Sequence, residues 1–280
     1  MKYLQLVRIK HWIKNFLIFI PMICGGVVNI ENLLQTLLAF LSFSFMTSFI
    51  YIINDVRDIE KDKLHPRKKN RPLASGKIKK NTAIYIAVIM LILSILFNIL
   101  LTDKILSLSL YFLIAYMIIN MAYSFGLKNV AIIDVVLLAS GFIIRVYYGA
   151  AIVNLEVSSW LFLTILNASL FLGLGKRKKE LINNKDSRKV LKEYNEEFLD
   201  KFQYLCLGLM LVFYSLWTIE QKIKYLFLTI PIIMIVFMKY CLVIEKSDEG
   251  DPITILYQDK FLLGLCGFYG IVMLILLVVI

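Results

Sequence analysis

Residues 33–62 read LLQTLLAFLSFSFMTSFIYIINDVRDIEKD, an apolar run that ends abruptly in a charged segment. A helix of about 20 mostly apolar residues is long enough to cross the hydrocarbon core of a bilayer. Three aspartates follow this run, Asp55, Asp58 and Asp62, at spacings of three and four residues. On one helix, at 100° per residue, they would fall within an arc of about 60°. The sequence therefore predicts a membrane helix with a carboxylate cluster at its end.

Long apolar runs recur along the whole chain. Of its 280 residues, 60% are hydrophobic, whereas globular domains have roughly 45–50%. Backbone groups in lipid must bond within their own segment, which favours helices, and the alternation of a membrane β-barrel is absent. Gly141 and Gly149 predict close helix approach in the fifth run. We expect an all-α integral membrane protein, with 1–280 as a single polytopic domain. Its nine predicted transmembrane helices are about 13–30, 33–53, 82–101, 105–123, 131–152, 158–175, 203–219, 225–244 and 261–280.

The net charge of +11 is unevenly distributed. If the N-terminus shares a side with the loops after the even-numbered spans, that side holds 26 of the 31 lysines and arginines. The positive-inside rule then places the N-terminus in the cytoplasm and the C-terminus on the opposite side. Basic loops against a membrane favour phosphate head groups or phosphorylated substrates as partners, and they do not favour nucleic acid. The cytoplasmic loops expected to carry function are about 54–80, 123–134 and 175–202.

The carboxylate cluster has the composition of a magnesium site. Mutual repulsion of three aspartates on one helix face opposes helix formation unless a cation lies among them. Mg²⁺ takes few carboxylates and completes its shell with water and phosphate oxygens. Asn54 precedes the cluster, and Arg67 and Arg71 follow it. We therefore predict that the three aspartates bind Mg²⁺ for a diphosphate group. The alternative is a solvated acidic helix end, paired with the basic residues that separate the aspartates.

These segments resemble a known family. Asn-Asp-x-x-Asp-x-x-x-Asp after the second of nine spans is similar to the motif of the UbiA superfamily of intramembrane prenyltransferases. Four further segments resemble its decaprenyl-phosphate phosphoribosyltransferase branch, and the resemblance covers essentially the whole chain. They are Arg8-Ile-Lys-His-Trp-Ile-Lys-Asn15, His65-Pro-Arg-Lys-Lys-Asn-Arg-Pro-Leu-Ala-Ser-Gly76, Tyr123-Ser-Phe-Gly-Leu-Lys128, and Asp134 with Gly141-Phe-Ile-Ile-Arg145.

The resemblance implies a reaction and its partners. The branch transfers a 5-phosphoribosyl group from phosphoribosyl diphosphate to a polyprenyl phosphate and releases diphosphate, with Mg²⁺ as cofactor. We therefore expect a bacterial-type cell membrane, contact with membrane lipids and no nucleic acid, and a homo-oligomer is compatible with the sequence. The superfamily's more common reaction joins a prenyl diphosphate to an aromatic or other acceptor, and the aspartate motif serves both. A transporter of anionic lipid or phosphate is a further alternative from another class.

The segment after the sixth span separates these reactions in part. Many superfamily members carry a second aspartate-rich motif there, whereas residues 175–181 read GKRKKEL. Basic residues suit substrates with additional phosphate, which favours the phosphoribosyl donor. Glu180 shares a helix face with Lys176 and Lys179, so we expect it to orient a lysine. Anchoring of this segment to the inner leaflet is an equally weighted alternative.

The remaining ionisable and polar residues complete the predicted site. Lys14 and Asn15 begin the first span on the inner side. Ionisable groups within a span are functional by default, although Arg145 could instead pair with an unidentified carboxylate. We predict catalytic roles for Asp55, Asp58, Lys14, Tyr123 and Lys128. Phosphate binding is predicted for Asn15, Asn54, Arg67, Arg71, Lys128, Asp134, Arg145, Lys176, Arg177, Lys179 and Glu180.

Overall fold

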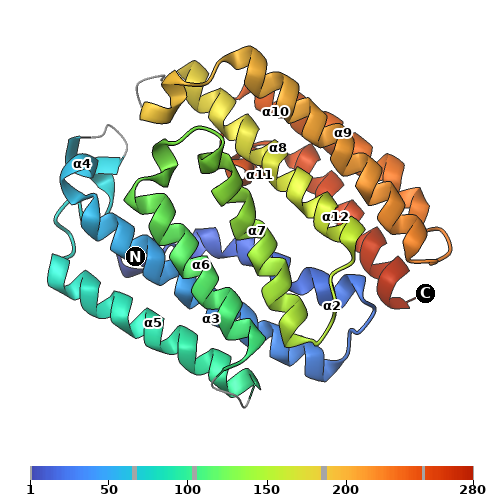
Figure 1. Ribbon diagram of the computed structural model, residues 1–280, viewed down its shortest axis with the longest axis horizontal. Coiled ribbons are helices and arrows are strands. Elements are labelled where there is room, and N and C mark those ends of the chain that lie inside the picture. Colours follow the sequence, from blue (N-terminus) through green and yellow to red (C-terminus); the bar gives the residue numbers. More distant parts are fainter. Residues whose placement is uncertain (1, 65–67, 103–105, 184–187, 248–249, 280) are drawn as a thin grey trace. The chain divides into compact units, whose positions relative to one another are not determined.

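The protein is all-helical (Figure 1). Its helices form two compact units. Unit 1 comprises residues 1–124 and 144–156, and unit 2 comprises 125–143 and 157–280. Helix α7 (Ile133–Ile152) contributes its first half to unit 2 and its second half to unit 1. The computed structural model describes residues 2–64, 68–102, 106–183, 188–247 and 250–279.

Unit 1 is built around a long helix that carries the aspartate motif. This helix, α3, begins after Asn29, whose side chain accepts a hydrogen bond from the backbone N–H of Asn32 (2.8 Å) and caps it. Helix α5 packs along α3 (Figure 1). The elements of unit 1 other than α7 are α1 Lys2–Val7, η1 Ile9–Phe19, α2 Ile20–Cys24, α3 Ile30–Arg57, α4 Ile59–Leu64, η2 Lys68–Asn70, α5 Lys80–Thr102 and α6 Leu108–Phe125.

The core of unit 1 brings η1, α3, α6 and α7 together. Phe43 of α3 lies 4.6 Å from the ring of Tyr116 and 5.2 Å from that of Tyr148, measured between centroids. Gly149 allows α7 to approach η1 closely, because a Cβ at this position would lie 2.1 Å from the carbonyl oxygen of Ile18. The predicted close approach at Gly149 is therefore confirmed.

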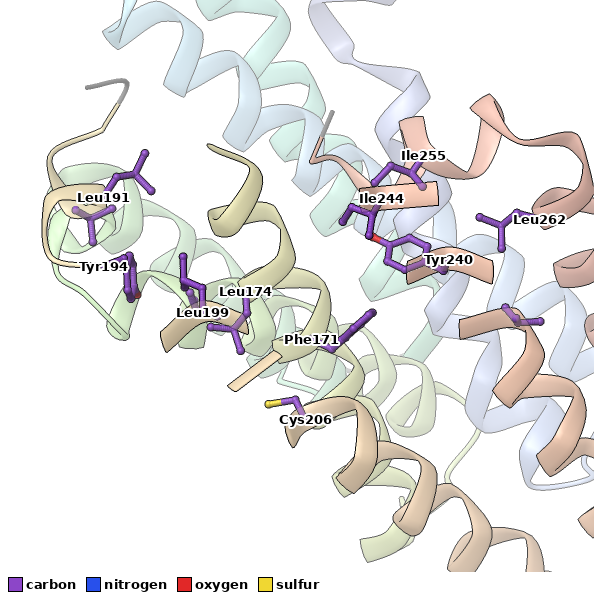
Figure 2. Packing of buried hydrophobic residues seen from close by; sticks show 13 residues of the cluster. Phe171, Leu174, Leu191, Tyr194, Leu199, Cys206, Tyr240, Ile244, Ile255 and Leu262 are labelled. Carbon is purple, nitrogen blue, oxygen red and sulfur yellow. The ribbon is translucent and has the colours of Figure 1, made fainter. Parts of the chain in front are cut away.

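Unit 2 packs its helices around an aromatic and aliphatic core (Figure 2). Phe171 of α8 is fully buried and lies against Tyr240 of α10, with 5.7 Å between ring centroids. Helices α8 and α9 run side by side. The elements other than α7 are η3 Leu127–Asn129, α8 Ser159–Asn183, η5 Lys189–Lys192, α9 Glu196–Glu220, η6 Leu226–Leu228, α10 Thr229–Lys246, α11 Pro252–Gln258, α12 Lys260–Leu274 and the π-helical η7 Ile275–Val279.

Within the described part of the chain, eight helices are long and apolar enough to cross a membrane. The nine predicted spans are therefore not all confirmed. The first, 13–30, is made of η1 and α2, neither of which is long enough to count as a spanning helix. The other eight predicted spans each correspond to one of the observed helices.

Candidate active site

The aspartate motif lies across two helices. Helix α3 ends at Arg57, Asp58 has φ −94° and ψ 13°, and α4 begins at Ile59. Two hydrogen bonds continue the helical pattern through this break: the N–H of Asp58 donates to the carbonyl of Asn54 (3.0 Å), and that of Asp62 donates to the carbonyl of Asp58 (2.8 Å). The motif therefore spans two helical segments, where the sequence had predicted one continuous helix.

One arginine joins the outer two aspartates. Asp55 and Asp62 are only 3% and 4% exposed. The Nη1 atom of Arg71 donates to Oδ1 of Asp55 (3.0 Å) and to Oδ2 of Asp62 (2.7 Å). The hydroxyl of Ser75 donates to the carbonyl of Arg71 (2.8 Å) and helps to fix the loop. Arg71 therefore lies beside the motif, and its phosphate-binding role stays a prediction.

Asp55 has a second cationic partner that the sequence prediction did not include. Nη2 of Arg8 lies 2.5 Å from Oδ1 of Asp55, so two guanidinium groups share one carboxylate oxygen. Buried carboxylates are stable only when such partners offset the cost of desolvation. The available signal was that Arg8 begins the N-terminal segment that resembles the family. Arg8 and Asp55 are 47 positions apart, so local spacing could not predict their contact.

Asp58 has a different environment. Its carboxylate pairs with Nε of Arg57 at 3.4 Å, and the two side chains are 23% and 32% exposed. Among the residues that the structure describes, no group of three or more histidine, cysteine, aspartate or glutamate side chains is arranged to hold a metal ion. The donor types nevertheless fit Mg²⁺, because two buried carboxylates already meet at one positive group and all available ligands are oxygens.

Asn15 and Arg145 are buried against each other rather than at a surface. They are 0% and 4% exposed, and Nε of Arg145 donates to Oδ1 of Asn15 (2.7 Å). Nη2 of Arg145 donates to the hydroxyl of Tyr116 (2.8 Å), and Nδ2 of Asn15 donates to Oγ of Ser44 (2.9 Å). The guanidinium also lies over the ring of Phe43, 5.2 Å from its centroid. This network ties η1 to α3, α6 and the second half of α7.

In unit 2, Asp134 and Arg177 form a fully buried ion pair. Nε of Arg177 lies 2.5 Å from Oδ2 of Asp134, and neither side chain is exposed. Tyr194 donates to the other oxygen of Asp134 (2.7 Å) and accepts from the N–H of Ile132 (2.6 Å). Burial raises the pKa of Tyr194, and the hydrogen bond to Asp134 raises it further, so the phenol stays protonated as a donor.

The basic segment after α8's apolar stretch is largely engaged with protein groups. Glu180 pairs with Nη1 of Arg177 (2.5 Å) and with Nε of Arg188 (3.1 Å), so it orients arginines, where the sequence had led us to expect a lysine. Nζ of Lys179 donates to the carbonyl of Glu245 (3.1 Å). The neighbouring Lys178, at the same end of α8, bonds to two carboxylates. These contacts stabilise the end of α8 within unit 2.

The structure places the other predicted site residues on separate elements. Lys14 lies on η1, Tyr123 near the end of α6, Lys128 on η3 and Lys176 on α8, and all four are half-buried. Arg67 lies outside the described residues.

Comparison with known proteins identifies the family of this chain. Residues 17–265 match the UbiA prenyltransferase family. The chain belongs to this family. The family resemblance predicted from the aspartate motif is therefore confirmed, and the protein is an integral membrane transferase of the UbiA family.

Two curated relatives cover nearly all of this UbiA-family chain. A decaprenyl-phosphate phosphoribosyltransferase of Corynebacterium glutamicum is 30% identical, over 96% of this chain and 85% of that protein. Another, from Mycolicibacterium smegmatis, is 29% identical over 92% of this chain and 87% of that protein. Among solved structures, a UbiA homolog from Archaeoglobus fulgidus bound to GPP and Mg²⁺ superposes with a TM-score of 0.74 at 20% identity, covering 98% of this chain and 99% of that one. This last likeness shows the all-helical UbiA-like fold.

Proposed function

We propose that this protein transfers the 5-phosphoribosyl group from phosphoribosyl diphosphate to a polyprenyl phosphate and releases diphosphate. The observation that carries the proposal is the similarity, over more than nine-tenths of the chain, to proteins named as decaprenyl-phosphate phosphoribosyltransferases. Lys176 lies where many family members carry a second acidic motif, which supports a substrate richer in phosphate. The buried carboxylates of unit 1 support the use of a metal-bound diphosphate leaving group.

The aspartate motif would hold the leaving group. Asp55, Asp58 and Asp62 are the residues that we assign to Mg²⁺, with Asn54 beside them. When bound, this ion would supply positive charge to the departing diphosphate. Arg71 already lies against two of these carboxylates, so its guanidinium is placed to contact a diphosphate oxygen held there.

The lysines would hold the other phosphates. Lys14, Lys128 and Lys176 are the residues that we assign to the 5-phosphate of the donor and the phosphate of the lipid. In the reaction, the bond between the ribosyl carbon 1 and the diphosphate oxygen breaks, and a lipid phosphate oxygen forms a new bond to that carbon from the opposite face. The acceptor is already an anion, so no strong general base is needed. Catalysis would rest on positioning and electrostatic stabilisation.

Substrate access fits the proposed topology. The donor is soluble and highly charged, so it must arrive from an aqueous side, whereas the polyprenyl chain stays in the bilayer. We assign the aspartate motif and the N-terminus to the cytoplasmic side of a bacterial-type cell membrane, on the basis of the positive charge gathered in those segments. The C-terminus would lie on the opposite side.

The test is a competition between donors. The purified protein in lipid nanodiscs is offered phosphoribosyl diphosphate and geranylgeranyl diphosphate together, with a polyprenyl phosphate and a phenolic acceptor. We expect Mg²⁺-dependent consumption of phosphoribosyl diphosphate alone. Consumption of geranylgeranyl diphosphate instead would assign the protein to the prenyl-transferring members of its family. The matched control is the Asp55→Asn variant, which should consume neither donor.

A further inference from the structure

Arg8 lies against an aromatic ring and a carboxylate of unit 1. Its guanidinium carbon is 4.6 Å from the ring centroid of Tyr51, and its Nη2 is 2.5 Å from Oδ1 of Asp55. Tyr51 and Asp55 are four residues apart on α3 and so lie on one helix face. The side chains of Arg8 and Asp55 are 17% and 4% exposed. Because water is largely excluded, this contact is stronger than a surface ion pair.

The backbone at Arg8 is held in an unusual conformation. Its φ of 55° and ψ of 47° lie in the left-handed region, where residues with a branched or long side chain are uncommon. The turn separates α1 from η1 and is fixed by α3, because the hydroxyl of Ser48 donates to the carbonyl of Val7 (2.8 Å). Backbone strain of this kind persists where the surrounding structure imposes it, often at functional sites. Here the turn keeps Arg8 near the aspartate motif.

The position of Arg8 conflicts with metal binding by Asp55. Oδ1 of Asp55 accepts from both Arg8 and Arg71. A divalent cation at the same carboxylate would repel two guanidinium groups at contact distance. We propose that Arg8 is the counter-ion of Asp55 in the absence of metal, that binding of a magnesium diphosphate displaces it, and that it then contacts the diphosphate. This inference rests on the proposed magnesium site, but it does not depend on which diphosphate ester is the donor.

The exchange predicts two effects of opposite sign. Removing the charge of Arg8 should strengthen binding of a divalent cation alone, because the competing cation is gone. The same change should weaken binding of the cation together with diphosphate, because one contact to the anion is lost. A residue that only positions Asp55 would weaken both. A residue without a role at the site would change neither.

The experiment measures Mn²⁺ binding to the purified full-length protein in detergent, from the electron paramagnetic resonance signal of the free ion. Titrations are made with and without inorganic diphosphate, for wild type, Arg8→Gln and Lys63→Gln. Lys63 is a matched control, since it pairs with the exposed Glu60 and its loss removes the same charge from the same region. For Arg8→Gln we expect Mn²⁺ alone to bind about 3-fold tighter and Mn²⁺ with diphosphate about 10-fold weaker. Lys63→Gln should change either by less than about twofold.

Weaker or unchanged binding of Mn²⁺ alone by Arg8→Gln would overturn the exchange, and so would Mn²⁺ binding too weak to measure in every variant. If Arg8→Gln does not fold, Arg8→Lys decides, because lysine keeps the charge but not the planar guanidinium. It should bind Mn²⁺ alone as wild type does and bind the diphosphate complex less tightly. If Arg8→Lys binds both Mn²⁺ alone and Mn²⁺ with diphosphate as wild type does, the proposal is also overturned. Because neither phosphoribosyl nor prenyl groups are used, a wrong donor assignment would leave these results unaffected.

Discussion

At the scale of single residues, the three aspartates of the motif are not equivalent. Asp55 and Asp62 are buried and meet at one arginine nitrogen, whereas Asp58 lies at the break between two helices and is partly exposed. A buried carboxylate that loses its charge also releases its arginine partners. Substitution at Asp55 should therefore change both metal binding and the positions of Arg8 and Arg71.

We expect Asp55→Asn to lower the rate of transfer by at least ~10²-fold, the loss typical when one electrostatic group is removed from an active site. Amide and carboxylate have similar shapes, so the variant should remain folded. Glu60→Gln is the control, because the side chain of Glu60 is 82% exposed, and its rate should stay within about twofold of wild type. Turnover is measured with the purified variants in nanodiscs. Wild-type turnover by Asp55→Asn would show that Asp55 does not bind the metal.

The buried pair of Asp134 and Arg177 allows a thermodynamic test of a structural role. Removing one partner leaves an uncompensated buried charge, so Asp134→Asn and Arg177→Met should each lower the free energy of unfolding by about 3–5 kcal/mol. In this double-mutant cycle, the double variant should lose less free energy of unfolding than the two single variants lose together. The difference is the coupling energy, which we expect to be about 1–3 kcal/mol. Equilibrium unfolding in mixed micelles measures these values.

The exposed pair of Glu197 and Lys201 provides the comparison for this cycle. These side chains are 76% and 71% exposed, and their coupling energy should be about 0.3–0.5 kcal/mol. Equal coupling energies for the two pairs would argue against a structural role for the buried pair. That result would favour the role predicted for Arg177 from the sequence, which is phosphate binding.

At the scale of secondary-structure elements, η1 explains why one predicted span did not appear as a spanning helix. Hydropathy identified residues 13–30 as apolar, but a count of apolar residues does not include tertiary hydrogen bonds. Nε1 of Trp12 donates to Ser48 and Nδ2 of Asn15 donates to Ser44. Polar side chains of η1 are therefore hydrogen-bonded to α3. The result is an 11-residue 3₁₀ helix, unusual in length for its type. The other eight predicted runs each correspond to a helix long and apolar enough to cross a membrane.

Gly149 offers a test of the packing between η1 and α7. An added methyl group would overlap the backbone carbonyl of Ile18, which cannot rotate away as a flexible side chain could. We expect Gly149→Ala to lower the free energy of unfolding by about 1–3 kcal/mol, and to lower activity because Lys14 lies on η1. Gly208→Ala is the control, since nothing lies within 4 Å of its Cβ position. It should be neutral or stabilise α9 by up to about 1 kcal/mol. A destabilisation by Gly208→Ala as large as that by Gly149→Ala would contradict this account of α7.

At the scale of the whole molecule, the sequence was sufficient for the fold class and the family. Long apolar runs and one spaced aspartate motif are local features, and they correctly predicted an all-helical UbiA-type membrane protein. Contacts between distant segments were not predictable from spacing. Arg8 reaches Asp55 across 47 positions, and Arg177 reaches Asp134 across 43. Such pairs determine which basic residues bind the protein itself and which are available to a substrate.

The proposed function requires that the donor's ribosyl group, and not an isoprenoid, is transferred. It is tested most directly with phosphoribosyl diphosphate carrying ¹⁴C in the ribose and ³²P in the β-phosphate, incubated with polyprenyl phosphate and the protein in nanodiscs. We expect ¹⁴C in the lipid fraction and ³²P in the aqueous fraction as diphosphate, only with Mg²⁺ and not with Asp55→Asn. The proposed function would be contradicted if no ¹⁴C enters the lipid fraction and phosphoribosyl diphosphate stays intact, while the same wild-type preparation consumes geranylgeranyl diphosphate.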